Sequence, residues 1–148
     1  MDYKENKGGA LKVVIITMLI VILIGSIGIF VGIQIIEYSN FKEFSNELKI
    51  MQKNVDRLYD EIDNSQSIGK DISEDIRAAK IFVNCGILAD KNDYRLFDTE
   101  TIQKLKIENV TGEYLVNLNT RSVLSYKGYE YKGKVYYTLS DLPDDLRK

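Results

Sequence analysis

The chain has 148 residues, and its 20 basic side chains nearly balance its 22 acidic ones. This balance, without a block of like charge, gives no sign of nucleic-acid binding. The sequence contains no histidine and one cysteine, Cys85. It therefore lacks an imidazole base, an intramolecular disulfide and the ligand spacing of a metal site. Cys85 stands among apolar residues and is expected to be a small buried side chain.

An uncharged, strongly apolar run covers residues 13–36, and its polar members are Thr17, Ser26 and Gln34. As a helix it would be roughly 36 Å long at about 1.5 Å per residue, enough to cross a hydrocarbon core of about 30 Å. A single strand cannot cross a bilayer, because its backbone would lack hydrogen-bond partners. Helices of soluble cores are rarely apolar on every face over such a length. The sequence therefore predicts a transmembrane helix over residues 10–36, surrounded by the lipid bilayer.

The segment before this helix, residues 1–9, is a short polar tail. Lys4, Lys7 and Lys12 precede or open the apolar run, against two acidic residues. Short basic flanks stay on the cytoplasmic side, so we expect the N-terminus inside the cell and residues 37–148 outside the cell membrane. The run is about twice as long as the apolar region of a cleaved signal peptide. We therefore expect a permanent single-pass anchor.

Residues 37–64 continue with helical periodicity and contain no proline. Apolar residues recur there at alternating spacings of three and four, which predicts one continuous helix from Ala10 to Asp63 with an amphipathic second half. This stripe consists of Phe41, Phe44, Leu48, Met51, Val55, Leu58 and Ile62. It is either a coiled-coil seam with another chain or a surface that packs on this chain's own strands. We favour intrachain packing, because the strands downstream need a partner for their apolar face.

The region after the long helix, residues 70–148, is predicted to form one small α+β domain. A break over residues 64–69 comes first, and a second helix starts near Asp71 or Ser73 and stops at Gly86. The expected apolar face of that helix comprises Ile72, Ile76, Ala79 and Val83. Residues 90–93 form a polar turn and residues 94–97 are short and extended. Asp98 or Thr99 caps a two-turn helix that ends at Leu105.

From Thr111 the apolar period changes from 3.6 to 2, which indicates strands. Four short strands are expected, separated by hairpin-sized turns: residues 113–119, 122–126, 129–131 and 135–139. They predict an antiparallel β-meander with tyrosine pairs across its strands. Pro143 is expected to end the ordered part. The expected fold is α+β, a long N-terminal helix packed on this meander with one or two short helices between them.

The sequence carries little chemistry. It contains no phosphate-binding loop, no dinucleotide fingerprint and no metal-ligand pattern, so we expect neither an enzyme nor a cofactor. Two carboxylate clusters stand out, and we interpret the first as helix-start chemistry and the second as a solvated tail. These clusters are Asp71, Glu74 and Asp75, and Asp141, Asp144 and Asp145.

Two stretches carry a resemblance to a known family. The start, KENKGGALKVVIITMLIVILIGSIGI, resembles the opening of pilin-like proteins of clostridia and related Firmicutes. The end, IENVTGEYLVNLNTRSVLSYKGYEYKGKVYYTLSDLP, looks like the closing segment of the same group. The chain thus resembles type IV pilins and pseudopilins, and with the amphipathic helix the similarity covers most of its length.

The resemblance implies a non-enzymatic structural subunit of a type IV pilus or a type II secretion-like assembly. In that family a prepilin peptidase cuts after a glycine, for which Gly8 is the matching residue and Gly9 the alternative, and the apolar helices of neighbouring pilin-like subunits then bundle. The family usually has glutamate at the fifth mature position, where this chain has Val13 or Val14. This departure favours a minor role or a permanent anchor. The alternative is a single-pass, coiled-coil interaction protein that never enters a filament.

Overall fold

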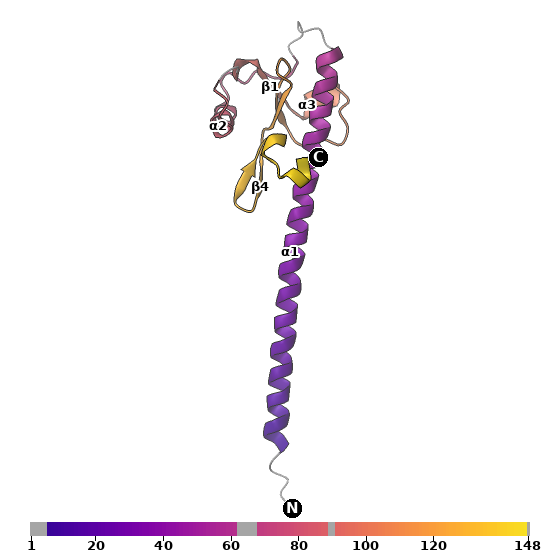
Figure 1. Ribbon diagram of the computed structural model, residues 1–148, viewed down its shortest axis with the longest axis vertical. Coiled ribbons are helices and arrows are strands. Elements are labelled where there is room, and N and C mark those ends of the chain that lie inside the picture. The colour runs from indigo at the N-terminus through magenta and orange to yellow at the C-terminus, as the bar shows by residue number, and fades with distance from the viewer. Residues whose placement is uncertain (1–5, 62–67, 89–90, 148) are drawn as a thin grey trace, which may run out of the picture. The chain divides into compact units, whose positions relative to one another are not determined.

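The computed structural model describes residues 6–61, 68–88 and 91–147, except the side chains of residues 6–11 and 25–30 (Figure 1). The chain is α+β and divides into two compact units, residues 1–39 and 40–148. The helix α1, Asn6–Glu61, belongs to both units. The predicted break over residues 64–69 and the turn over residues 90–93 lie partly outside the described residues.

Helix α1 follows from a sequence without proline, and its bounds lie close to the predicted ones. Asp63, the expected last residue, lies outside the described residues. Among the residues that the structure describes, no helix combines the length and the apolarity needed to cross a membrane. The expected span over residues 10–36 includes residues 25–30, whose side chains lie outside the described part of the chain.

The second unit contains short elements around the C-terminal part of α1. The three further α-helices are α2 (Ile76–Asn84), α3 (Thr99–Lys104) and α4 (Asp144–Arg147). The strands are β1 (Tyr94–Phe97), β2 (Tyr114–Asn117), β3 (Ser122–Ser125), β4 (Tyr129–Tyr131) and β5 (Lys134–Tyr136). The 3-10 turns η1 (Lys91–Asp93) and η2 (Leu139–Asp141) complete the described elements.

The strands form two antiparallel sheets, so the prediction of one four-stranded meander was wrong. β1, β2 and β3 form the first sheet in that order, and β4 and β5 form a separate hairpin. The chain leaves the edge of β3 at Gly128, whose φ of +70° suits glycine. A Cβ there would lie 2.7 Å from the Tyr137 ring and 2.9 Å from Val135 Cγ1. The Ser125 amide donates to the Tyr137 carbonyl (2.8 Å) and links the two sheets.

Strand β2 is buried on both faces, because the three-stranded sheet lies between two groups of apolar side chains. Tyr114 and Val116 belong to the core cluster that contains the α1 stripe, and Leu115 belongs to the cluster beneath α2. Alternate side chains of a strand point to opposite faces, so β2 serves both clusters. The sheet thus holds α1 on one side and α2 on the other.

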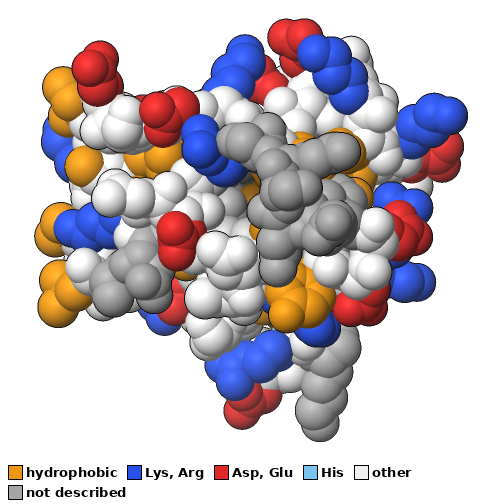
Figure 2. All heavy atoms as spheres, turned by 90° about the horizontal axis from the view of Figure 1, so that it is seen from above, with side chains coloured by type: hydrophobic (Ala, Val, Ile, Leu, Met, Phe, Trp, Pro, Cys, Tyr) orange, Lys and Arg blue, Asp and Glu red, His pale blue; other side chains and the backbone are white. Residues whose placement is uncertain are grey.

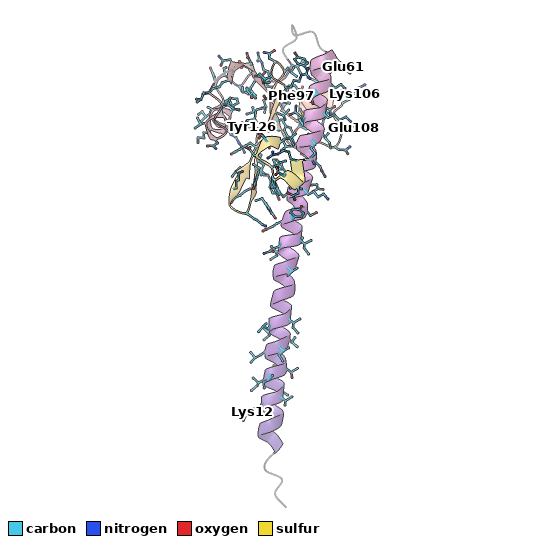
Figure 3. The ribbon with its side chains drawn as sticks, in the orientation of Figure 1. Lys12, Glu61, Phe97, Lys106, Glu108 and Tyr126 are labelled. Atoms are coloured by element: carbon cyan, nitrogen blue, oxygen red, sulfur yellow. The ribbon has the colours of Figure 1, made fainter. Side chains whose placement is uncertain are left out.

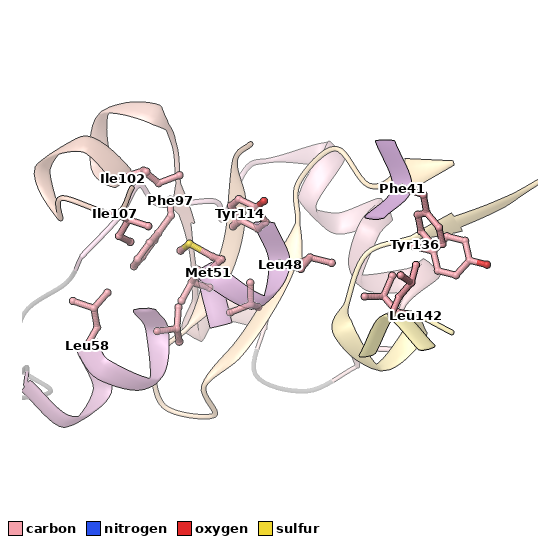
Figure 4. Packing of buried hydrophobic residues seen from close by; sticks show 14 residues of the cluster. Phe41, Leu48, Met51, Leu58, Phe97, Ile102, Ile107, Tyr114, Tyr136 and Leu142 are labelled. Atoms are coloured by element: carbon pink, nitrogen blue, oxygen red, sulfur yellow. The ribbon is translucent and has the colours of Figure 1, made fainter. Parts of the chain in front are cut away.

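The apolar stripe of α1 lies in the first of these clusters (Figure 4). Phe41, Leu48, Met51 and Val55 are fully buried, Leu58 is 5% exposed and Phe44 is partly buried. The stripe contacts this chain's own sheet, which is the intrachain arrangement of the two considered above. Ile62 lies outside the described residues. The partners include Phe97, Ile102, Ile107, Tyr114, Tyr136 and Leu142.

Helix α2 begins later and faces differently than predicted. Its N-cap is Asp75, which accepts hydrogen bonds from the amides of Arg77 and Ala78. The buried face comprises Ala78, Ile81 and Phe82. Of the predicted face, Ile72 is buried ahead of the helix, while Ile76, Ala79 and Val83 are exposed. The segment carries apolar residues on two faces, so periodicity alone selected the wrong one.

The C-terminal segment is also more ordered than predicted. Pro143 is followed by α4, and Leu146 on this short helix is buried. The hydroxyl of Ser45 on α1 donates to the carbonyl of Leu146 (2.9 Å). Proline suits the start of a helix because it needs no backbone donor there. The prediction that Pro143 ends the ordered part was therefore wrong.

Replacement of Leu58 by alanine should lower the free energy of unfolding of the second unit by about 2–5 kcal/mol, because it leaves a cavity against the sheet. Urea unfolding of the full chain in a nonionic detergent measures this loss. Lys53→Ala, an exposed position on the same helix, is the matched control and should change stability little. Equal effects of the two substitutions would contradict packing of Leu58 in the core.

Candidate functional site

The candidate functional surface of the first unit is the apolar part of α1. The described aliphatic side chains over residues 13–24 and 31–36 are each about half to two-thirds exposed, from 49% at Val31 to 67% at Ile22. None of them belongs to either core cluster. Consecutive helical residues are turned by about 100°, so these side chains cover every face of the helix. Figure 3 shows them as sticks on α1 above Lys12.

Apolar surroundings would favour this surface. Full burial of one Val, Leu or Ile side chain is favourable by about 1.5–3 kcal/mol, so the whole surface would be costly in water. Thr17, one of its polar members, donates its hydroxyl to the Val13 carbonyl one turn earlier (2.8 Å). That hydrogen bond satisfies the hydroxyl within the helix. The segment therefore presents an almost uniform apolar surface to whatever surrounds it.

The two candidate cleavage residues, Gly8 and Gly9, lie in the first turns of α1, which begins at Asn6. Lys12 is exposed on the helix just before the apolar residues. A long lysine side chain at such a position can extend its ammonium group to a membrane interface while its methylene groups remain apolar.

In the second unit, hydrogen bonds to Glu47 join α1 to the loop before β2 and to the first residue of β2. Its carboxylate accepts hydrogen bonds from the Thr111 amide (3.2 Å) and hydroxyl (2.6 Å), the Gly112 amide (3.3 Å) and the Tyr114 hydroxyl (2.9 Å). Burial and the adjacent Glu47 carboxylate raise the pKa of the Tyr114 hydroxyl. Glu47 was not singled out from the sequence, because its partners are more than 60 residues away and no local pattern pairs them.

A second carboxylate, Asp98, joins the start of α3 to the segment before α2. It accepts hydrogen bonds from the Thr101 amide (3.0 Å) and hydroxyl (2.7 Å) and pairs with the ammonium group of Lys70. These bonds hold the pKa of Asp98 well below its usual range and raise the pKa of Lys70. Asp98 was one of the two predicted caps of this helix, and it is the N-cap.

The predicted carboxylate clusters are occupied by local hydrogen bonds. Asp75 caps α2 and also accepts from the Tyr126 hydroxyl (2.8 Å), while Asp71 accepts from the Ser73 amide and hydroxyl. Asp141 forms a capping box with Thr138 at the start of η2. No group of three or more potential metal-ligating side chains gathers among the described residues. One member of each cluster, Asp75 in the first and Asp141 in the second, thus takes part in a cap.

A shallow groove of about 450 Å³ lies between η2 and the turn after β2. Its lining includes Cys85, Arg121, Ser140 and Asp141. Cys85 is half-buried, and burial followed by the charge of Asp141 raises the pKa of its thiol to about 11. A thiol that stays protonated is a poor nucleophile. The Cys85 thiol is thus not activated as a nucleophile.

The charges of the surface are mixed. On the face shown in Figure 2, basic and acidic side chains alternate around the rim without a large patch of one sign. This face therefore has no long stripe of positive charge of the kind that a polyanion binds.

Comparison with known proteins identifies no relative: no protein-family model, no curated protein and no solved structure matches this chain.

Replacement of Glu47 by glutamine should lower the free energy of unfolding by about 1–3 kcal/mol. Glutamine replaces one acceptor oxygen by an NH₂ donor. The backbone amides of Thr111 and Gly112 can only donate, so one of them would lose its acceptor and face another donor. Urea unfolding of the full chain in detergent measures the change. Glu43→Gln, an exposed position on the same helix, is the control. An equal change in both variants would argue against a stabilising role of the Glu47 hydrogen bonds.

The Asp98 carboxylate should make stability depend on pH in the acid range. Its pKa is lower in the folded state than in the unfolded state, so its contribution is present above the unfolded value of about 3.9 and is lost as the pH falls below it. Asp98→Asn should therefore reduce the acid dependence of the free energy of unfolding. Asp93→Asn, an exposed carboxylate on η1, should leave it unchanged; identical pH profiles for both variants would contradict this role.

Proposed function

We propose that this protein is a pilin-like structural subunit anchored in the cell membrane by the apolar part of α1. The observation that carries the proposal is the exposure of aliphatic side chains on every face of α1 over residues 13–24 and 31–36. Lipid, or the apolar helices of neighbouring subunits, would remove this surface from water. Residues 37–148 would then lie outside the cell and the short basic tail inside it.

The two parts of α1 support this division of roles. The described aliphatic side chains of the first part belong to neither core cluster, whereas the second part buries one stripe against its own sheet. A helix of this kind can anchor or bundle through its first half while its second half carries a folded unit. The sequence resemblance to type IV pilins and pseudopilins adds the kind of assembly, a type IV pilus or a type II secretion-like system. Prepilin peptidase would then act at Gly8 or Gly9.

The valines at the expected glutamate position favour a minor subunit. A carboxylate within the apolar helix would need a partner, because an unpaired charge in lipid is costly. Val13 is 64% exposed and Val14 52% exposed, so both suit a lipid-facing helix without such a partner.

A single-pass interaction protein that does not enter a filament is the second candidate, and the same two valines favour it. In its coiled-coil form the α1 stripe would pair with another chain. Crosslinking of Met51→Cys and Leu58→Cys separates the two arrangements, because both residues are buried in the chain's own core. Efficient homodimer crosslinks at both positions would favour the coiled coil.

The intact mass and N-terminal sequence of the protein recovered from its native membrane test the pilin proposal. A chain that begins at Gly9 or Ala10 would show prepilin processing and favour assembly with other pilin-like subunits. A chain that begins at Met1 or Asp2 would contradict processing and favour the permanent anchor. Recovery in the fraction extracted by alkaline carbonate without detergent would contradict membrane anchoring in either form.

A further inference from the structure

The β4–β5 hairpin packs on the beginning of the second unit's part of α1. The Tyr131 ring stacks on Phe41 with 4.4 Å between ring centroids, and the Tyr136 ring lies 4.8 Å from the same phenylalanine. The centroid of the Tyr129 ring lies 5.7 Å from that of Phe41 and 5.2 Å from that of Phe44. Strand β4 therefore runs along α1 from the level of Phe44 to that of Phe41. Its turn, Lys132–Gly133, follows at the Asn40 end of the unit.

Few residues separate this end of the unit from the apolar segment in the sequence. Phe41 comes five residues after Ile36, the last residue of the uncharged run. Five residues span about 7.5 Å in a helix and at most about 18 Å when fully extended. The polar headgroup layer of a bilayer is roughly 5–8 Å thick on each side. If the apolar segment lies in a bilayer, the Phe41 end of the unit cannot move far from the headgroups.

The side chains at the hairpin turn suit an anionic lipid surface. Lys132 and Lys134 are exposed at the turn itself, and the exposed Glu130 precedes Tyr131 on β4. The Lys132 ammonium lies 5.1 Å from the centre of the Tyr131 ring, and Lys134 donates to the Asp141 carbonyl (3.4 Å). Tyrosine favours membrane interfaces because its ring is apolar and its hydroxyl is polar. Each lysine near an anionic membrane adds attraction.

We propose that the β4–β5 turn, through Lys132 and Lys134 beside Tyr131, docks on anionic phospholipid headgroups of the membrane that holds α1. This inference rests on the proposed membrane anchoring and adds a second contact with the same bilayer. The aromatic packing on Phe41 holds the turn in place, so docking needs no rearrangement of the hairpin. The contact would limit the directions that the second unit can take relative to the membrane.

Lysine acetylation of the full chain tests this docking. The chain is reconstituted in vesicles of phosphatidylcholine alone or with about 30% phosphatidylglycerol, and the acetylation rate of each lysine is measured by mass spectrometry. Acetylation needs the neutral form of the amine. A nearby lipid phosphate favours the charged ammonium form and shields the amine from the reagent. We expect phosphatidylglycerol to lower the acetylation rates of Lys132 and Lys134 by about fivefold at low salt and by less at high salt. Lys80, exposed on α2, is the internal control and should not change.

A variant gives an independent readout. In the double variant Lys132→Gln/Lys134→Gln, hydrogen exchange of the backbone amides over residues 129–136 should be the same in both kinds of vesicle. The unaltered chain should exchange more slowly at these amides in the vesicles that contain phosphatidylglycerol. Lys80→Gln should behave like the unaltered chain. Inorganic phosphate added to phosphatidylcholine vesicles should not reproduce the protection, which distinguishes a lipid surface from a free anion.

The outcomes separate this inference from the proposed function. A chain that stays out of vesicles of both compositions would overturn the anchoring and the docking together. A chain that inserts but whose Lys132 and Lys134 react equally in both lipids would overturn the docking alone. An equal fall in the acetylation rate of Lys80 would also overturn the docking, because phosphatidylglycerol would then protect lysines over the whole surface.

Discussion

The second unit depends on the burial of one stripe of α1 against β2. Each part covers apolar side chains of the other: the stripe lies on the sheet, and the short strands gain a packed face that supports them. Tyr114 and Val116 cover the stripe, and Leu115 on the same strand faces the cluster beneath α2. One strand thereby joins both cores. The other elements are placed by their contact with this arrangement.

Polar interactions fix the register of this packing. Glu47 reaches from the middle of the stripe to the loop that enters β2, so the helix cannot slide along the sheet without losing four hydrogen bonds. Apolar contacts alone tolerate such sliding, because they have little directional preference. Lys70 and Asp98 likewise join two segments, next to the backbone hydrogen bonds between Lys70 and Leu96. Caps and clamps thus select one arrangement among several that would bury similar area.

Local patterns predicted the elements better than their partners. The α1 stripe and the Asp98 cap could be found from spacing and side-chain type, because both depend on neighbours within one or two turns. The separation of β4 and β5 from the first sheet depends instead on how Gly128 packs against Tyr137 and Val135. The buried face of α2 depends on where Leu115 and Leu124 lie. Both facts concern distant residues, which periodicity does not encode. Within the candidate surface, the apolar run was evident from composition, whereas the Glu47 clamp had no sequence signal.

The contact between Ser45 and Leu146 joins positions 101 residues apart. During synthesis the stripe of α1 emerges long before Tyr136, Leu142 and Leu146, which cover its Phe41 end. At about 5–20 residues per second, that wait lasts roughly 5–20 s. Throughout this interval the nascent chain exposes an amphipathic helix whose closing partners do not yet exist. The Phe41 end of the stripe is therefore the last part of this core to gain its full cover.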